Sequence, residues 1–134
     1  ELLKKYADAA VISDLVSKKL IKVVPVKRKS FRIPISMDKG EIEALVLASQ
    51  TATPIVATDD RKAIKACRYL KIPFIISPKI AIELYRMGKI DFEKVKSGVE
   101  KMKIIGRYSP DIIVEALLEL EVIRNAKNSH SQGS

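Results

Sequence analysis

The sequence is poor in the residues that carry many kinds of catalysis. Its 134 residues include one cysteine, one histidine, no tryptophan and few aromatic residues. A single cysteine, Cys67, excludes a disulfide framework and a cysteine-based zinc site. The lone histidine, His130, lies close to the C-terminus and gives little support to histidine-based catalysis. The shortage of aromatic residues argues against base-stacking platforms and carbohydrate stacking.

Long apolar runs and targeting signals are also missing. No run approaches the roughly 18 residues that a membrane span needs, and no signal peptide is visible. Hydrophobic residues make up 47% and charged residues 31% of the chain, which is typical of a globular protein. These absences predict a cytoplasmic protein without a membrane partner.

The charge is strongly unbalanced, with 25 basic and 16 acidic residues and a net charge of +9. This balance favours a polyanionic partner such as nucleic acid. A lysine-rich surface, which is common in heat-adapted proteins, is the other interpretation.

The distribution of charge is more informative than the total. No acid occurs over 15–37 or over 61–82, and basic residues fill both stretches: Lys18, Lys19, Lys22, Lys27, Arg28, Lys29 and Arg32, then Arg61, Lys62, Lys65, Arg68, Lys71 and Lys79. Five acids lie between them: Asp38, Glu41, Glu43, Asp59 and Asp60. An acidic island with basic flanks suits a metal site that also holds phosphates, although windows of this length can lack acids by chance.

Apolar periodicity predicts alternating helices and strands. Strands are expected over 9–12, 21–26, 54–58 and 73–76, and helices over 13–20, 38–49, 60–70, 77–87, from 91 onward and over 111–125. Ser77 and Ser109, each followed by proline, are predicted helix starts. The pattern indicates an α/β fold with a mainly parallel sheet and an appended C-terminal helical cluster. Cys67 is expected in the core, and residues 127–134 are expected to form a disordered tail.

Four acidic residues are candidates for a site at the carboxyl edge of this sheet. Asp59 and Asp60 directly follow the expected strand over 54–58. One of them, Asp60, can cap the next helix, which leaves Asp59 over the sheet edge. Glu41 fits a capping box with Asp38, so a structural role competes with a catalytic one. Glu43 points to a different face from Glu41, so at most one of the two easily joins a shared site.

If strand ends and helix starts converge, clustered carboxylates would repel unless a divalent cation binds them. Mg²⁺ or Mn²⁺ held there could activate a water for phosphodiester attack. Competing mechanisms lack their residues: there is no triad, no P-loop and no glycine-rich dinucleotide fingerprint.

Two stretches carry a family resemblance: 38–48, DKGEIEALVLA, and 54–63, PIVATDDRKA. Together they resemble a PIN domain, in particular small prokaryotic PIN proteins related to VapC-type toxins, over roughly residues 1–125. The resemblance implies a three-layer α/β sandwich and an Mg²⁺- or Mn²⁺-dependent ribonuclease. It implies that Glu41, Asp59 and Asp60 are catalytic and metal-binding, with Asp60 the closer match to the catalytic aspartate. Asp14 falls near a further acid of the family and is a fourth expected metal ligand, and Glu43 takes a supporting role.

One part of the family pattern has no counterpart here. PIN domains begin with an apolar strand that ends in an aspartate, the principal metal ligand, and nothing in the sequence before Asp8 matches that strand. We therefore expect a single PIN-like domain over 1–126 without its N-terminal strand. The chain as it stands is expected to be metal-poor and weakly active or inactive. Ser77-Pro78-Lys79 also stands where relatives often have a glycine-rich turn.

The resulting hypothesis is a metal-dependent endoribonuclease, in one version the toxin of a toxin–antitoxin pair. The alternative is a catalytically inactive PIN-like module that binds nucleic acid or protein. The expected partners are RNA, a second copy of the chain in a homodimer, and an antitoxin protein docked on the apolar final helix. The RNA-binding residues are expected to be Lys27, Arg28, Lys29, Arg32, Arg61, Lys62 and Lys65.

Overall fold

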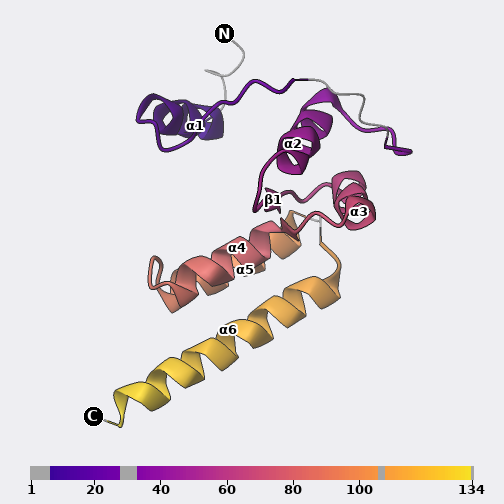
Figure 1. The fold of residues 1–134 in the computed structure, drawn as a ribbon. Helices are drawn as coiled ribbons and strands as arrows, with labels where there is room; N and C mark the ends of the chain where they lie inside the picture. Colours follow the sequence, from indigo (N-terminus) through magenta and orange to yellow (C-terminus); the bar gives the residue numbers. More distant parts are fainter. Residues whose placement is uncertain (1–6, 28–32, 106–107, 134) are drawn as a thin grey trace. The chain divides into compact units, whose positions relative to one another are not determined.

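The computed structural model describes residues 7–27, 33–105 and 108–133 (Figure 1). The chain divides into two compact units, residues 1–31 and residues 32–134. In order, the elements are α1 (Ala7–Ser17), α2 (Lys39–Ser49), β1 (Val56–Ala57), α3 (Arg61–Leu70), β2 (Phe74–Ile75), α4 (Ser77–Arg86), α5 (Phe92–Ile104) and α6 (Pro110–Ser131). This is a mixed α/β fold with a helical extension, as the sequence predicts.

The N-terminal unit differs from its prediction. Residues 9–12, expected to be a buried strand, lie within α1, and Val11 is 60% exposed. A short apolar run does not distinguish a strand from a helix, because both can bury it. Residues 21–26, expected to be an edge strand, belong to no strand, since strand-like side chains form a strand only when a partner completes the backbone ladder.

The second unit contains a short parallel sheet. Val56 pairs with Phe74, and Ala57 pairs with Ile75. The ladder continues on both sides, because Val56 N–H donates to Pro73 O at 2.9 Å and Thr58 N–H donates to Ile75 O at 3.1 Å. Helix α3 is the crossover between the two strands, so the carboxyl ends of β1 and β2 lie side by side.

Small buried side chains set the packing around this sheet. Ala63, Ala66 and Cys67 form the inner face of α3 and are almost fully buried, as are Leu45 of α2 and Val56 of β1. Helix α3 ends at Leu70. Its C-cap, Lys71, has a left-handed φ of 56°, and Ile72 N–H donates to Cys67 O at 2.9 Å. The predicted core position of Cys67 is confirmed.

Helices α4, α5 and α6 form a cluster with a core of its own. The buried residues are Ile82, Tyr85, Val95, Val99, Ile113, Ala116, Leu120 and Ile123. The ring of Tyr85 meets Phe92 edge to face at a centroid distance of 5.9 Å, and the Arg124 guanidinium lies 4.4 Å from the Phe92 centroid. The predicted C-terminal helical cluster is therefore present.

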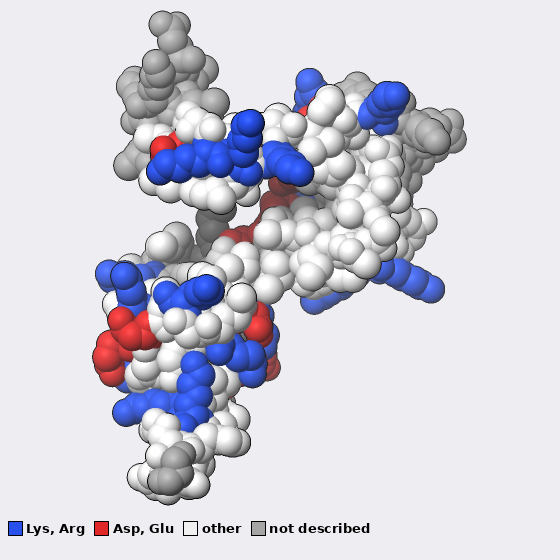
Figure 2. Space-filling view, turned by 60° about the vertical axis from the view of Figure 1, so that its left-hand side comes forward, with Lys and Arg blue, Asp and Glu red and all other residues white. Residues whose placement is uncertain are grey.

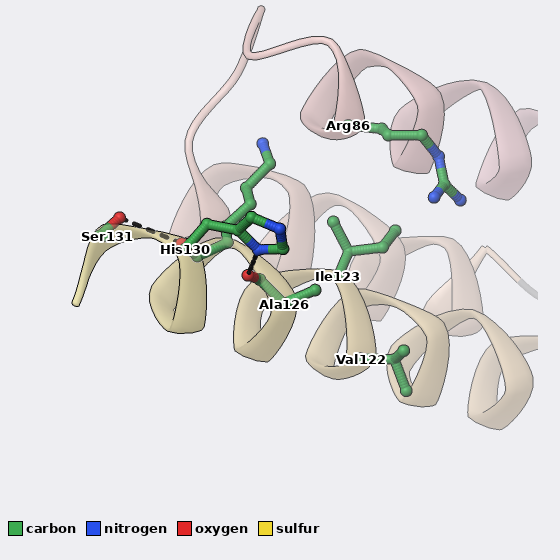
Figure 3. Close-up of a pocket in the computed structure, with 7 residues that line it drawn as sticks. Arg86, Val122, Ile123, Ala126, His130 and Ser131 are labelled. Atoms are coloured by element: carbon green, nitrogen blue, oxygen red, sulfur yellow. Dashed lines mark hydrogen bonds between the residues drawn. The ribbon is translucent and has the colours of Figure 1, made fainter. Parts of the chain in front are cut away.

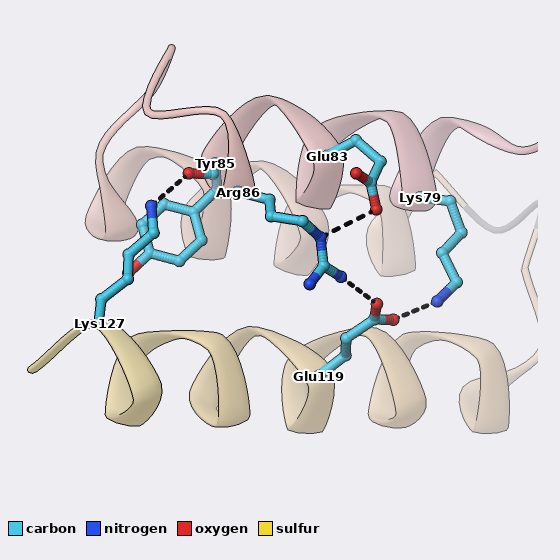
Figure 4. A network of polar contacts seen from close by, with 6 residues as sticks. All are labelled: Lys79, Glu83, Tyr85, Arg86, Glu119 and Lys127. Carbon is cyan, nitrogen blue, oxygen red and sulfur yellow. Dashed lines mark hydrogen bonds and ion pairs between the residues drawn. The ribbon is translucent and has the colours of Figure 1, made fainter. Parts of the chain in front are cut away.

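Ion pairs connect the surfaces of α4 and α6 (Figure 4). Glu119 of α6 accepts from Lys79 and from Arg86, the latter at 3.0 Å, and Arg86 also contacts Glu83 at 3.2 Å. Lys127 donates to the backbone carbonyl of Tyr85 at 2.7 Å. The cations of α4 and α6 are thus largely balanced by neighbouring acceptors.

Helix α6 is longer than the sequence predicts. It continues to Ser131, so residues 127–131, expected to belong to a disordered tail, are helical. Each added turn gains backbone hydrogen bonds at little further cost. Side chains of this end also bond to carbonyls one turn earlier: Ser129 Oγ donates to Asn125 O at 2.9 Å, and Ser131 Oγ donates to Lys127 O at 3.0 Å.

Candidate functional site at the carboxyl end of the sheet

Asp59 lies at the carboxyl end of β1 and is held by the residue that follows β2. Its Oδ1 accepts from Ser77 N–H at 2.8 Å, and its Oδ2 accepts from Ser77 Oγ at 2.5 Å. The sequence predicts Ser77 to be the N-cap of α4, but Ile76 occupies that position and Ser77 is the first helical residue. The parallel strand ends explain the change, since they bring Ser77 beside Asp59. In the sequence, the signal for this contact is that Ser77 directly follows an expected strand.

Asp60, the residue that follows Asp59, has a different role. Its Oδ1 accepts from Lys62 N–H and Ala63 N–H, both at 2.8 Å, and thereby caps α3. Asp59 and Asp60 therefore direct their carboxylates to different partners. The resemblance favours Asp60 as the catalytic aspartate, whereas the geometry gives Asp60 a structural role and leaves Asp59 at the sheet edge.

Glu41 caps α2. Asp38 N–H donates to Glu41 Oε2 at 3.1 Å as part of the predicted capping box. Glu41 also lines a pocket of about 200 Å³ together with Ala57 and Thr58, the residues at the end of β1. Glu43, on the same helix, lies 3.9 Å from Lys39 in an ion pair.

A second pocket, of about 270 Å³, lies on the Asp59 side. Asp59, Arg61 and Ile64 line it together with Ile76, Tyr108, Ser109 and Ile112, so the starts of α3 and α6 both border it. An acidic and a basic residue thus line one pocket at the sheet edge. Arginine is well suited to hold a phosphate there, because its planar fork can donate two parallel hydrogen bonds.

The remaining predicted residues fall elsewhere. Asp14 lies in the N-terminal unit, where its carboxylate pairs with Lys18 at 2.7 Å. Lys27 is exposed, while Arg28, Lys29 and Arg32 lie outside the described residues. Arg61, Lys62 and Lys65 are exposed on α3.

Carboxylate oxygens are the ligands that Mg²⁺ prefers, so the residue types at this edge suit a cation. Their arrangement does not complete a site. Over residues 7–27, 33–105 and 108–133, no three side chains of His, Cys, Asp or Glu gather closely enough to hold a metal ion. Asp60 and Glu41 are bound to backbone amides and Asp59 to Ser77.

A third pocket, of about 620 Å³, lies at the far end of the helical cluster (Figure 3). Arg86, Lys127 and His130 line it beside the apolar Val122 and Ile123. The His130 ring faces its own helix, with Nδ1 2.8 Å from Ala126 O. This pocket contains none of the acidic residues that the sequence singles out.

In the described part of the chain, no helix has the length and hydropathy to cross a bilayer. A family model described as DUF3368, a PIN domain, matches residues 1–121. The chain matches no curated protein and no solved structure.

Proposed function

This chain belongs to the PIN-domain family, and from that membership we propose that it is an endoribonuclease that hydrolyses RNA phosphodiester bonds with Mg²⁺ or Mn²⁺. The observation that carries the proposal is the carboxylate of Asp59, held by Ser77 at the carboxyl end of a parallel sheet and sharing a pocket with Arg61. Ligand sites in open parallel sheets form at this edge.

The chain's own residues account for substrate binding at this edge. Arg61 stands at the pocket, where its guanidinium can orient a phosphate. Lys62 and Lys65 follow on the exposed side of α3 and attract the RNA backbone. Ser77 fixes the direction of the Asp59 carboxylate through two hydrogen bonds, so the acid stays aligned at the sheet edge.

An RNA cleavage assay tests the proposal. Labelled RNA is incubated with excess protein in Mg²⁺, in Mn²⁺ or in EDTA, and products are separated on a denaturing gel, because single-turnover conditions reveal weak activity. We expect internal cleavage with either metal, none in EDTA, and a loss of at least tenfold in Asp59→Asn. Asp91→Asn is the matched control, since Asp91 is a helix-capping aspartate of α5.

Asp60→Asn and Glu41→Gln separate capping from catalysis. Asparagine caps helices as well as aspartate does, so Asp60→Asn keeps α3 and removes one negative charge. A large loss of cleavage in that variant, with unchanged stability, would show that Asp60 is a catalytic residue. Metal-independent cleavage, or wild-type cleavage by Asp59→Asn, would contradict the proposal.

The second candidate function is RNA binding without cleavage. The structural bonds made by Glu41, Asp59 and Asp60 favour it, because each of these carboxylates already serves a protein group. This candidate predicts salt-sensitive RNA binding with no products in any divalent metal.

A toxin role is a finer version of the first proposal and rests on the resemblance to VapC-type proteins. Induction of the chain in a bacterial host is then expected to arrest growth, and Asp59→Asn is expected to relieve the arrest at equal protein level. Normal growth under induction of the wild-type chain would exclude this role.

A further inference from the structure

The outer face of α3 carries an unusual set of side chains. Arg61, Lys65 and Tyr69 follow one another at intervals of four residues, so they form one row along the helix. Lys62 and Arg68 flank the row. We use the name α3 row for all five residues, the three in line and the two beside them. All five are exposed, while Ala63, Ala66 and Cys67 bury the opposite face.

Helix α3 is the one helix of the described residues that contains no acidic residue. Over 7–27, 33–105 and 108–133, no ion pair involves a cation of the α3 row. The cluster of α4, α5 and α6 is different, since acidic and basic side chains lie next to each other over its surface in the lower part of Figure 2. Asp59 and Asp60 lie only at its first turn, so the α3 row is a net positive surface, which attracts a polyanion.

Tyr69 gives this surface a second property. Its side chain is 65% exposed, although tyrosine usually buries much of its ring. An exposed ring among cations is the combination with which proteins bind single strands: cations contact phosphates and the ring stacks on a base. Bases in a duplex are stacked on one another and do not offer a face to such a ring.

We infer that the α3 row binds a single-stranded segment of RNA, with Tyr69 stacked on an unpaired base and with Arg61, Lys62 and Lys65 contacting phosphates. This inference rests on RNA being the substrate of the proposed function. Arg68 is given no phosphate contact, because its guanidinium already lies 5.6 Å from the centroid of Phe74.

The row ends at the candidate site. Arg61 belongs both to the row and to the pocket of Asp59. Tyr69 lies about 12 Å from Arg61 along the helix axis, at 1.5 Å per residue. A strand held on α3 therefore leads toward Asp59, and a base on Tyr69 would fix its register. The overall shortage of aromatic residues does not contradict this, since one exposed ring suffices.

Fluorescence anisotropy tests the inference in EDTA, where cleavage is suppressed. The probes are a labelled single-stranded RNA of twelve nucleotides and the duplex of the same sequence. We expect Tyr69→Ala to weaken single-strand binding by about 5- to 150-fold, the range that base stacking gives, and to leave duplex binding unchanged. Tyr69→Phe, which keeps the ring, is expected to bind as the wild type does.

Charge variants test the phosphate contacts separately. Arg61→Gln with Lys65→Gln is expected to weaken binding of both probes. The slope of log K against log salt should fall in magnitude by about 1.4 on the single strand and by about 1.8 on the duplex. Lys101→Gln on α5 is the control for loss of one exposed charge elsewhere. Circular dichroism checks that each variant keeps its helices.

The outcomes separate this inference from the proposed function. Unchanged single-strand binding in Tyr69→Ala, or an equal loss on the duplex, overturns the stacking role even if RNA is still cleaved. Binding that depends on Tyr69 without cleavage in Mg²⁺ or Mn²⁺ supports the α3 row and overturns the endoribonuclease proposal.

Discussion

Ser77 donates two hydrogen bonds to the carboxylate of Asp59, eighteen positions earlier in the chain, and so ties the carboxyl end of β2 to that of β1. The sheet has only two residues in each strand, and this side-chain pair extends the link beyond the ladder. Asp59 therefore has two roles: it stabilises the sheet edge, and it is a candidate residue of the substrate site.

Removal of the Asp59 side chain is expected to destabilise the protein. Asp59→Ala leaves the partly buried Ser77 N–H without its acceptor, which costs about 1–3 kcal/mol. Urea unfolding followed by circular dichroism measures the change. Asp111→Ala, an exposed aspartate in the first turn of α6, is the control and is expected to lose less than about 1 kcal/mol. Equal losses in the two variants would show that the Ser77 bonds contribute nothing.

Capping by Asp60 gives a second stability prediction. Asp60→Ala removes the acceptor of two backbone amides and is expected to cost about 1 kcal/mol, whereas Asp60→Asn is expected to be nearly neutral. Asp91→Ala, at the start of α5, is expected to show a similar loss. A cost for Asp60→Asn as large as for Asp60→Ala would mean that charge, rather than capping, is what α3 requires.

Burial raises the pKa of the Cys67 thiol. The native thiol therefore keeps its proton at pH values where the unfolded thiol, with a pKa of about 8.5, has lost it. Since the native state then binds more protons, the free energy of unfolding falls as pH rises above about 8.5. Urea unfolding across pH 7 to 10 is expected to show a smaller decline in Cys67→Ala than in the wild type.

Alkylation provides an independent check on Cys67. Iodoacetamide is expected to modify the native thiol at least tenfold more slowly than the urea-unfolded thiol, because the native side chain is fully buried. Mass spectrometry measures the modified fraction. Equal rates in the two states would contradict the buried position.

Glu119 joins α4 to α6 through Lys79 and Arg86. The two cations are about half exposed, so solvent screens the pairs, and Glu119→Gln is expected to cost at most about 1 kcal/mol. The loss should shrink in 1 M salt. A double-mutant cycle with Arg86→Ala measures the coupling, and a coupling that does not change with salt would exclude an electrostatic origin.

An exposed apolar row on α6 gives a prediction for self-association. Val114, Leu118 and Val122 are 53%, 62% and 68% exposed and follow at intervals of four residues. We expect this row to contact a second copy, so Leu118→Glu should weaken a dimer measured by sedimentation velocity. Ile104→Glu, at the end of α5, is the control. A wild-type chain that sediments as a monomer at tens of micromolar would exclude the dimer.

The sequence predicts best where the signals are local. The starts of α2, α3 and α5 follow from Asp38, Asp60 and Asp91, because a capping side chain acts on amides two or three residues away. The predictions of strands at 9–12 and 21–26 are wrong because a strand forms only beside a partner strand, which is distant in sequence and which propensity does not encode.

The candidate site shows the same division. Capping by Asp60 and Glu41 is local and could be read from spacing. The contact of Asp59 with Ser77 depends on two strands lying side by side, so the sequence predicts the edge but not the pair. The predicted convergence of carboxylates around a cation depends on still more distant elements, and over the described parts of the chain the acids make separate hydrogen bonds.

The crossover helix also sets a limit on how this chain can change in length. Helix α3 turns once every 3.6 residues. Insertion of a single residue between Arg61 and Tyr69 would therefore rotate Tyr69 by about 100° around the helix relative to Arg61. The insertion would divide the α3 row between two faces of the helix and would turn a buried apolar side chain toward solvent. Variation in length should therefore be tolerated in the turn that follows α4, at Gly88, and not within α3.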